Sequence, residues 1–162
     1  MNKTMSALIA SLVSSCREKD LSGGICLNTA NALCACVAER AAEMGVNAVI
    51  AVAGPGGHPV SVQCMDDAYI ASYDIAVNKA FTATALKMST AELKPLAQPG
   101  GSLYGIQFTN NGKIVIFGGG VPLYNKGGRI LGGLGVSGGT EEQDTELGKF
   151  GGELFAACLK NI

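Results

Sequence analysis

Hydrophobic residues recur at intervals of three and four along several stretches of the chain, and this spacing is typical of amphipathic helices. It predicts one helix over residues 5–16 and a second over about 28–44, with Gly45 placed to end it. A long third helix is expected from Asp66 or Asp67 to about Lys87. Its predicted inner face consists of Ile70, Tyr73, Val77, Ala80, Phe81 and Thr84.

Two further helices are predicted from their capping signals. Ser89 and Glu92 have the spacing of a capping box, so a short helix is expected to begin there and to end at Pro95 and residues 99–101. Thr140, followed three positions later by Gln143, is expected to cap a final helix. The apolar side chains of that helix are Leu147, Phe150, Leu154, Phe155 and Leu159.

Apolar and alternating runs predict strands between these helices. The expected strands cover residues 46–53, 58–64, 113–117, 121–124 and 129–136. Tight turns join most of the neighbouring strands, which implies antiparallel pairing. The sequence therefore predicts a single α+β domain over residues 1–162, with a five-stranded antiparallel sheet and packed helices in the profilin-like or PAS-like style.

The chain carries few charges for its size. Charged residues make up 15% of the sequence and hydrophobic residues 48%, whereas about 25% charged is typical. A monomer so poor in charge would expose much apolar surface, so we expect a homo-oligomer. No membrane span is expected, because no apolar run approaches the ~20 residues that a spanning helix needs. The net charge of −1, without a Lys or Arg cluster, argues against nucleic-acid binding.

Six cysteines are present without a CxxC pair, so neither a zinc-finger site nor a thioredoxin-like motif is predicted. Reduced and mostly buried thiols in a cytoplasmic protein are expected. The N-terminal segment leaves an alternative open, because its apolar run ends in Val13-Ser14-Ser15-Cys16 and this ending fits a bacterial lipoprotein anchored through Cys16. We prefer the interpretation as an ordered amphipathic helix.

Residues 133–138 match the GxGxxG pattern of dinucleotide-binding proteins. Such a site needs a second parallel strand after the helix, and the sequence ends at Ile162 without one. Glu141, Glu142 and Asp144 would also repel a pyrophosphate from the start of the final helix. No NAD site is therefore expected, and the glycines are expected to let a strand and a helix approach closely or to line a subunit contact.

His58 is the only histidine, and it follows two glycines in a predicted turn. Two interpretations of His58 stay open: a residue that contacts or ligates a cofactor, and an ordinary turn histidine. Cys64 lies ~20 Å further along the same predicted strand at about 3.3 Å per residue, which is too far for a Cys–His catalytic pair. No catalytic residue is assigned.

Two other features are candidate binding elements. Gly118, Gly119 and Gly120 lie between two predicted strands, where ordering three glycines is costly. The close approach of a flat ligand or of another backbone would offset that cost, and a wide bulge is the alternative. Lys79, on the predicted third helix, holds an acidic group such as a propionate or lies on a solvated helix face.

Four strings in the same order resemble a known family: GGHPVSVQCMDDA at 56–68, KAFTA at 79–83, GGGVPL at 118–123 and ILGGLGVSGGTEEQD at 130–144. Together they resemble the GlcG/HbpS family of haem-binding proteins, which includes the C-terminal domain of PduO-type corrinoid adenosyltransferases. The resemblance covers about residues 27–150 and leaves residues 1–24 as an added N-terminal helix. It implies a profilin-like fold, stacked subunits and binding of haem or a related tetrapyrrole. For the PduO branch it also implies a setting in cobalamin-dependent diol or glycerol metabolism.

The resemblance also implies which residues bind the cofactor. His58 is the preferred iron ligand because imidazole is the usual neutral axial ligand, and Cys64 and Met65 are the backups. Gly54-Pro55 stand where many family members carry an aspartate, so any role of that carboxylate is lost. The matched positions are His58, Met65, Asp66, Lys79, Gly118, Gly119, Gly120, Pro122, Gly135, Ser137 and Gly138.

The leading functional hypothesis is a non-enzymatic accessory protein that binds haem or another tetrapyrrole and is associated with a cobalamin-dependent enzyme system. An enzyme acting on a small acid, with Lys79 and Asp66 as polar anchors, is one alternative. A structural assembly partner without a cofactor is the other.

Overall fold

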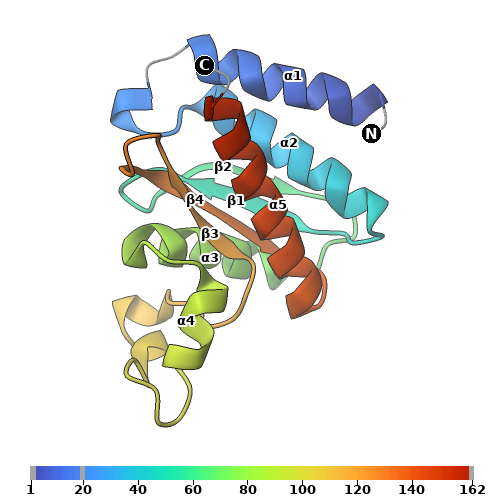
Figure 1. Cartoon of the computed structure of the whole chain (residues 1–162). Helices are drawn as coiled ribbons and strands as arrows, with labels where there is room; N and C mark the ends of the chain where they lie inside the picture. Colours follow the sequence, from blue (N-terminus) through green and yellow to red (C-terminus); the bar gives the residue numbers. More distant parts are fainter. Residues whose placement is uncertain (1–2, 19–20, 161–162) are drawn as a thin grey trace.

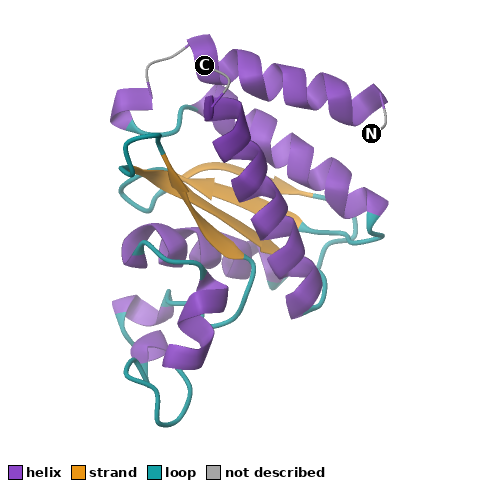
Figure 2. Ribbon diagram, viewed as in Figure 1, coloured by secondary structure: helices purple, strands orange, loops and turns teal. Residues whose placement is uncertain are grey.

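The computed structural model describes residues 3–18 and 21–160. In this part of the chain, five α-helices and a four-stranded antiparallel sheet of order β2-β1-β4-β3 form an α+β fold (Figures 1 and 2). The helices are α1 (Lys3–Glu18), α2 (Leu27–Glu43), α3 (Ser72–Leu86), α4 (Thr90–Leu96) and α5 (Glu141–Lys160). The strands are β1 (Val49–Ala53), β2 (Pro59–Cys64), β3 (Gly120–Tyr124) and β4 (Ile130–Ser137). Short 3₁₀ helices cover Leu21–Gly23, Ile106–Phe108 and Asn110–Gly112.

Helices cover both faces of the sheet. α2 and α5 pack on one face and α3 packs on the other, while α1 lies against α2 and α5 (Figure 1). β1 is buried at every position, because its alternating side chains enter two different cores. Ile50 and Val52 belong to the core shared with α2 and α5, whereas Val49, Ala51 and Ala53 pack with α3.

The helices predicted from periodicity and capping signals are confirmed. The apolar stripe of the N-terminal helix packs into the core, where Met5, Leu12 and Cys16 are buried. The Ser89–Glu92 capping box is present, although α4 continues through Pro95 to Leu96 instead of ending at the proline. The predicted face of the second helix is also buried, at Ala30, Leu33, Cys34, Val37 and Ala41.

The predicted start of the third helix is wrong. α3 begins at Ser72 and not at Asp66 or Asp67, because a series of turns precedes it. Asp67 has a φ of 62°, which is outside the right-handed helical region. Ile70, expected on the inner face, precedes the helix and is 97% exposed.

The fifth predicted strand, at residues 113–117, is also wrong. The backbone N–H of Val115 donates to the Thr82 hydroxyl at 3.0 Å, and that of Gly118 donates to the Glu141 carboxylate at 3.0 Å. These amides are therefore bonded to side chains of α3 and α5 and not to a neighbouring strand. The sheet in the described residues has four strands.

The glycines of β4 allow close packing of the sheet against α3, as expected. A Cβ atom on Gly135 would lie 2.1 Å from the carbonyl oxygen of Ala76, and one on Gly133 would lie 2.5 Å from that of Ala80. No larger residue is compatible with these two positions unless the helix moves.

Candidate functional site

His58 lies in the turn between β1 and β2, with its side chain exposed. Two backbone bonds hold the turn: Gly54 N–H donates to the His58 carbonyl and Gly57 N–H donates to the Gly54 carbonyl, each at 2.9 Å. Gly57 has a φ of 78°, a conformation that glycine adopts without strain. The turn therefore presents the imidazole at the surface from a well-held backbone.

An aromatic ring and a lysine lie beside this turn. A Cβ atom on Gly57 would come within 2.7 Å of the Phe81 ring, so the backbone of the turn rests on that ring. The ammonium of the exposed Lys113 lies 5.5 Å from the centroid of the same ring, within the range of a cation–π contact. We call His58, Phe81 and Lys113 the His58 surface. It combines an imidazole, a half-buried aromatic ring and a cation.

Thr82 explains why Lys113 lies there. Its buried hydroxyl accepts the Val115 N–H and lies 3.2 Å from the Lys113 carbonyl and 2.7 Å from the Asn78 carbonyl, to either of which it donates. The segment that begins at Lys113 is thereby fixed alongside α3, next to Phe81. Phe81 and Lys113 were not predicted as site residues, because nothing local in the sequence indicates that residues 113–115 bond to α3.

The backup iron ligands lie away from His58. In the β1–β2 ladder Ala53 pairs with Pro59 and Val49 pairs with Cys64, so His58 and Cys64 are at opposite ends of β2. Cys64 is exposed, whereas the Met65 sulfur accepts the backbone N–H of Ala48 at 3.4 Å. Asp66 follows in the same exposed turn. One chain therefore does not bring His58, Cys64, Met65 and Asp66 into one site.

Lys79 is fully buried, so the prediction that it lies on a solvated helix face is wrong. Its ammonium donates to the Asp144 carboxylate and to the Val136 carbonyl, each at 2.8 Å, and the Phe117 ring centroid lies 5.0 Å away. Burial lowers the pKa of Lys79, and the Asp144 carboxylate opposes that shift. The pair links α3, the end of β4 and the start of α5, and it leaves no donor of Lys79 at the surface for a propionate.

Gly118, Gly119 and Gly120 are buried against other parts of the same chain. A Cβ on Gly118 would lie 1.9 Å from the Thr145 hydroxyl, and one on Gly120 would lie 2.7 Å from the Lys79 carbonyl. Gly119 has a φ of 117° and would place a Cβ 2.6 Å from the Val136 carbonyl. Of the explanations offered by the sequence, close approach of another backbone accounts for Gly119 and Gly120, whereas Gly118 is crowded by the side chain of Thr145. Pro122 is half-buried in the edge strand β3, where it pairs with Gly133.

A cavity of about 350 Å³ lies beside the Lys79–Asp144 pair. Its polar walls are already bonded, since Asp144 holds Lys79 and the Ser137 hydroxyl lies 3.2 Å from that of Ser72. Glu141 and Asp144 are already paired with Lys94 and Lys79, and no lysine or arginine is among the lining residues to receive a carboxylate-bearing ligand. The cavity is lined by Tyr69, Ala71, Ser72, Ile75, Phe117, Ser137, Gly138, Gly139, Glu141 and Asp144.

Comparison with known proteins identifies the family. The family model described as "Haem degrading protein HbpS-like" matches residues 25–151. The chain belongs to the HbpS-like family. The match begins after α1, so the N-terminal helix lies outside the part of the chain that the family model covers.

Individual relatives of this HbpS-like chain support the assignment. An uncharacterised 15.0 kDa protein encoded between dhaT and dhaS of Citrobacter freundii is 44% identical over 132 residues, which is 82% of this chain and 92% of that protein. The corrinoid adenosyltransferase PduO of C. freundii is 44% identical over 108 residues, 67% of this chain but only 32% of PduO. The solved structure described as a PduOC:haem complex is 29% identical, with a TM-score of 0.71, and the alignment covers 95% of this chain and 94% of that one.

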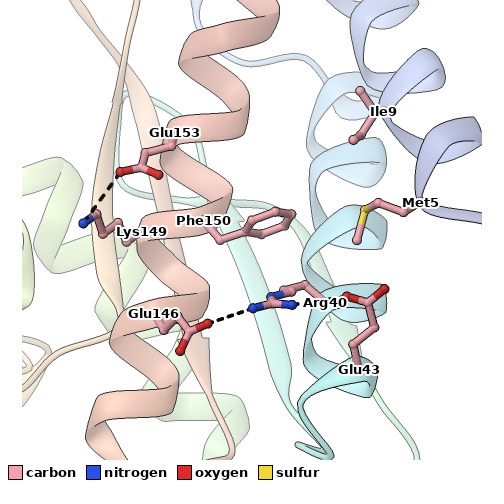
Figure 3. A pocket seen from close by; sticks show the side chains of 8 residues that line it. All are labelled: Met5, Ile9, Arg40, Glu43, Glu146, Lys149, Phe150 and Glu153. Carbon is pink, nitrogen blue, oxygen red and sulfur yellow. Dashed lines mark hydrogen bonds and ion pairs between the residues drawn. The ribbon is translucent and has the colours of Figure 1, made fainter. Parts of the chain in front are cut away.

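A groove lies where α1, α2 and α5 meet, and it is lined partly by α1, which precedes the matched segment (Figure 3). Its apolar floor includes Met5, Ile9 and Phe150. Arg40 bonds both Glu43 and Glu146 on its rim, at 3.3 and 2.9 Å, and the Lys149 and Glu153 charges are 3.8 Å apart. These rim charges already pair with one another, and His58 is not part of the groove.

Other features bear on the chemistry of this HbpS-like chain. No group of three or more His, Cys, Asp or Glu residues suitable for a metal ion occurs in residues 3–18 and 21–160. The same residues contain no helix that is long and apolar enough to span a membrane. Four of the six cysteines are buried, as expected, whereas Cys26 is half-buried and Cys64 is exposed.

Proposed function

We propose that this chain is an accessory protein that binds haem or a related tetrapyrrole on the His58 surface, with His58 as the axial ligand. The observation that carries the proposal is the PduOC:haem complex, whose fold aligns with 95% of this chain at 29% identity. Haem binding is also a step that haem degradation, named in the description of the family, requires.

The side chains of the His58 surface suit such a cofactor. The imidazole of His58 is exposed and offers a nitrogen ligand of the kind that haem iron commonly takes. The ring of Phe81 offers an apolar contact for a macrocycle, and the ammonium of Lys113 is placed to pair with a propionate. Met65, Asp66, Lys79 and residues 118–120 are left out of this proposed site, because they lie elsewhere or are bonded within the chain.

The setting of the protein is part of the same proposal. Self-association would cover the exposed apolar side chains. The relationship to PduO favours a role beside a cobalamin-dependent enzyme system, and we place that role in the cytoplasm. No catalytic residue is assigned to the chain, so the proposed role is to hold, shield or deliver the cofactor.

Titration of haemin into the purified apoprotein tests the proposal. The wild type is expected to give a saturable shift of the Soret band at micromolar haemin, and His58→Ala is expected to weaken binding at least tenfold through loss of the iron ligand. Absence of a saturable shift in the wild type would rule the proposal out.

Lysine variants test the placement of the cofactor. Lys113→Gln removes the cation beside Phe81 and is expected to weaken haemin binding several-fold, since a propionate loses its charged partner. Lys126→Gln removes another exposed lysine, in the β3–β4 turn, and should leave the affinity unchanged. Equal effects of the two substitutions would place the propionates elsewhere.

A further inference from the structure

β2 lies at one edge of the sheet. The strand order β2-β1-β4-β3 gives it β1 as its one strand neighbour in residues 3–18 and 21–160. Natural proteins protect such edges with charged side chains, prolines, bulges or a covering segment, because open amides and carbonyls accept another strand. None of the six residues of β2 is charged. Pro59 and a bulge lie near its start, whereas the half of the strand that ends at Cys64 pairs regularly with β1.

The pairing with β1 shows which residues of β2 face the outer side. The Met65 N–H donates to the Ala48 carbonyl at 3.0 Å, and along an antiparallel pair hydrogen-bonded positions alternate with positions that are not bonded. Gln63 is therefore bonded to β1, whereas Val62 and Cys64 direct their N–H and C=O groups away from it. Cys64 is exposed and Val62 is half-buried. These two residues form the open part of the edge.

The two ends of β2 differ in charge. Asp66 and Asp67 follow the strand and are both exposed. The turn before the strand contains no acidic residue, and Gly57 of this turn rests on the Phe81 ring, beside the exposed ammonium of Lys113. An antiparallel pair of two β2 strands brings the acidic end of each copy towards the basic end of the other, whereas a parallel pair brings like charges together. The charges therefore favour a second copy of the chain in antiparallel orientation.

We propose that two copies of the chain pair their β2 strands in antiparallel orientation and form one continuous sheet. Val62 lies opposite Cys64 of the partner subunit, because this register uses the two residues whose backbone groups face outwards. Gln63 then lies at the two-fold axis, and no charged side chains of the two strands face one another. The inference rests on the self-association proposed above and not on haem binding.

Cross-linking of the full chain at Cys64 tests the register. In the proposed pair the two Cys64 side chains are diagonal neighbours on one face of the sheet, about 7–8 Å apart. The thiol is exposed, so a bismaleimide of similar reach should join two copies of the chain. Peptide mapping should place the link between Cys64 and Cys64 of the partner subunit, and the Cys64→Ser variant should form no such link.

Amide exchange measured by NMR over a dilution series tests the strand pairing. In the assembled protein the amides of Val62 and Cys64 should be protected together with that of Gln63, and dilution should release only Val62 and Cys64. Cys64→Glu brings two carboxylates close together across the pair and is expected to raise its dissociation constant at least about tenfold. Cys64→Ser, which changes the same exposed side chain without adding a charge, should keep the wild-type constant.

The outcomes separate this contact from the function proposed above. An assembled wild type that is not cross-linked at Cys64, or whose Val62 and Cys64 amides stay unprotected, would overturn the proposal and leave the edge to a different partner. A wild type that is monomeric at all concentrations would overturn both this contact and the proposed self-association. Haemin titration of the same samples reports separately on haem binding.

Discussion

The buried ion pair between Lys79 and Asp144 shows how residue type alone misleads at the residue scale. Asn78 and Thr82 flank Lys79 on the helix, a pattern that suggested an outward-facing or ligand-binding lysine. Its partner lies 65 positions away in the sequence, so the pairing is not visible before the fold is known. A buried ammonium without this carboxylate would be expensive, which makes the pair a structural requirement.

Replacing Asp144 by Asn tests that role. The substitution leaves the Lys79 charge buried without its counter-charge and is expected to lower the free energy of unfolding by about 3–5 kcal/mol. Urea unfolding measures the loss. Glu153→Gln, which removes the exposed partner of Lys149, should cost less than about 1 kcal/mol. Similar small losses in both variants would contradict the structural role.

Gly135 permits a second residue-scale prediction. Gly135→Ala would place a methyl group 2.1 Å from the Ala76 carbonyl of α3, so the helix must shift. We expect a loss of about 3 kcal/mol in unfolding free energy. Gly23→Ala is the matched control, because no atom lies within 4 Å of its added Cβ. If Gly135→Ala is as stable as Gly23→Ala, α3 does not approach β4 as closely as described.

At the scale of elements, the sequence predicted what local signals determine. The amphipathic stripes of α1 and α2 and the capping box of α4 depend on residues within one or two helical turns, and all three helices are present. The strand predicted at residues 113–117 is absent, because the amides of Val115 and of the following Gly118 bond to side chains of α3 and α5. The same long-range contacts bring Lys113 to Phe81, so only His58 of the proposed site was found from the sequence.

The start of α5 gives a prediction about pH. The Glu141 carboxylate accepts the Gly118 N–H and pairs with Lys94, and these contacts, the first being the larger, lower the pKa of Glu141 below 4.5. A lowered folded pKa means that this stabilisation is present above the unfolded pKa and is lost as the pH falls through the folded value. In urea unfolding the advantage of wild type over Glu141→Gln should therefore shrink from about pH 6 to about pH 3. The advantage over Glu142→Gln, which replaces an exposed neighbour, should change less. A Glu141→Gln difference that is constant with pH would argue against these contacts.

At the scale of the whole molecule, large apolar side chains remain exposed on one chain. Tyr69 is 73% exposed, Ile70 is 97% exposed and Tyr73 is 48% exposed, all at the approach to and start of α3. Such a patch, together with the low charge content, favours contact with a second copy.

Light scattering of the Ile70→Glu variant tests whether this patch contributes to self-association. A charge at that position should lower the mass of the assembly, since a desolvated carboxylate disfavours the interface. Leu27→Glu, at the start of α2, replaces another exposed apolar side chain and should keep the wild-type mass. A wild type that is monomeric at all concentrations would contradict the proposed self-association.

The identity of the axial ligand is the most direct test of the account. Near-infrared magnetic circular dichroism of the ferric haem complex distinguishes histidine ligation from thiolate and thioether ligation. The wild type and Cys64→Ser are expected to show the histidine signature, and His58→Ala is expected to lose it. A spectrum that is unchanged in His58→Ala, or a thiolate spectrum that disappears in Cys64→Ser, would contradict the assignment of His58.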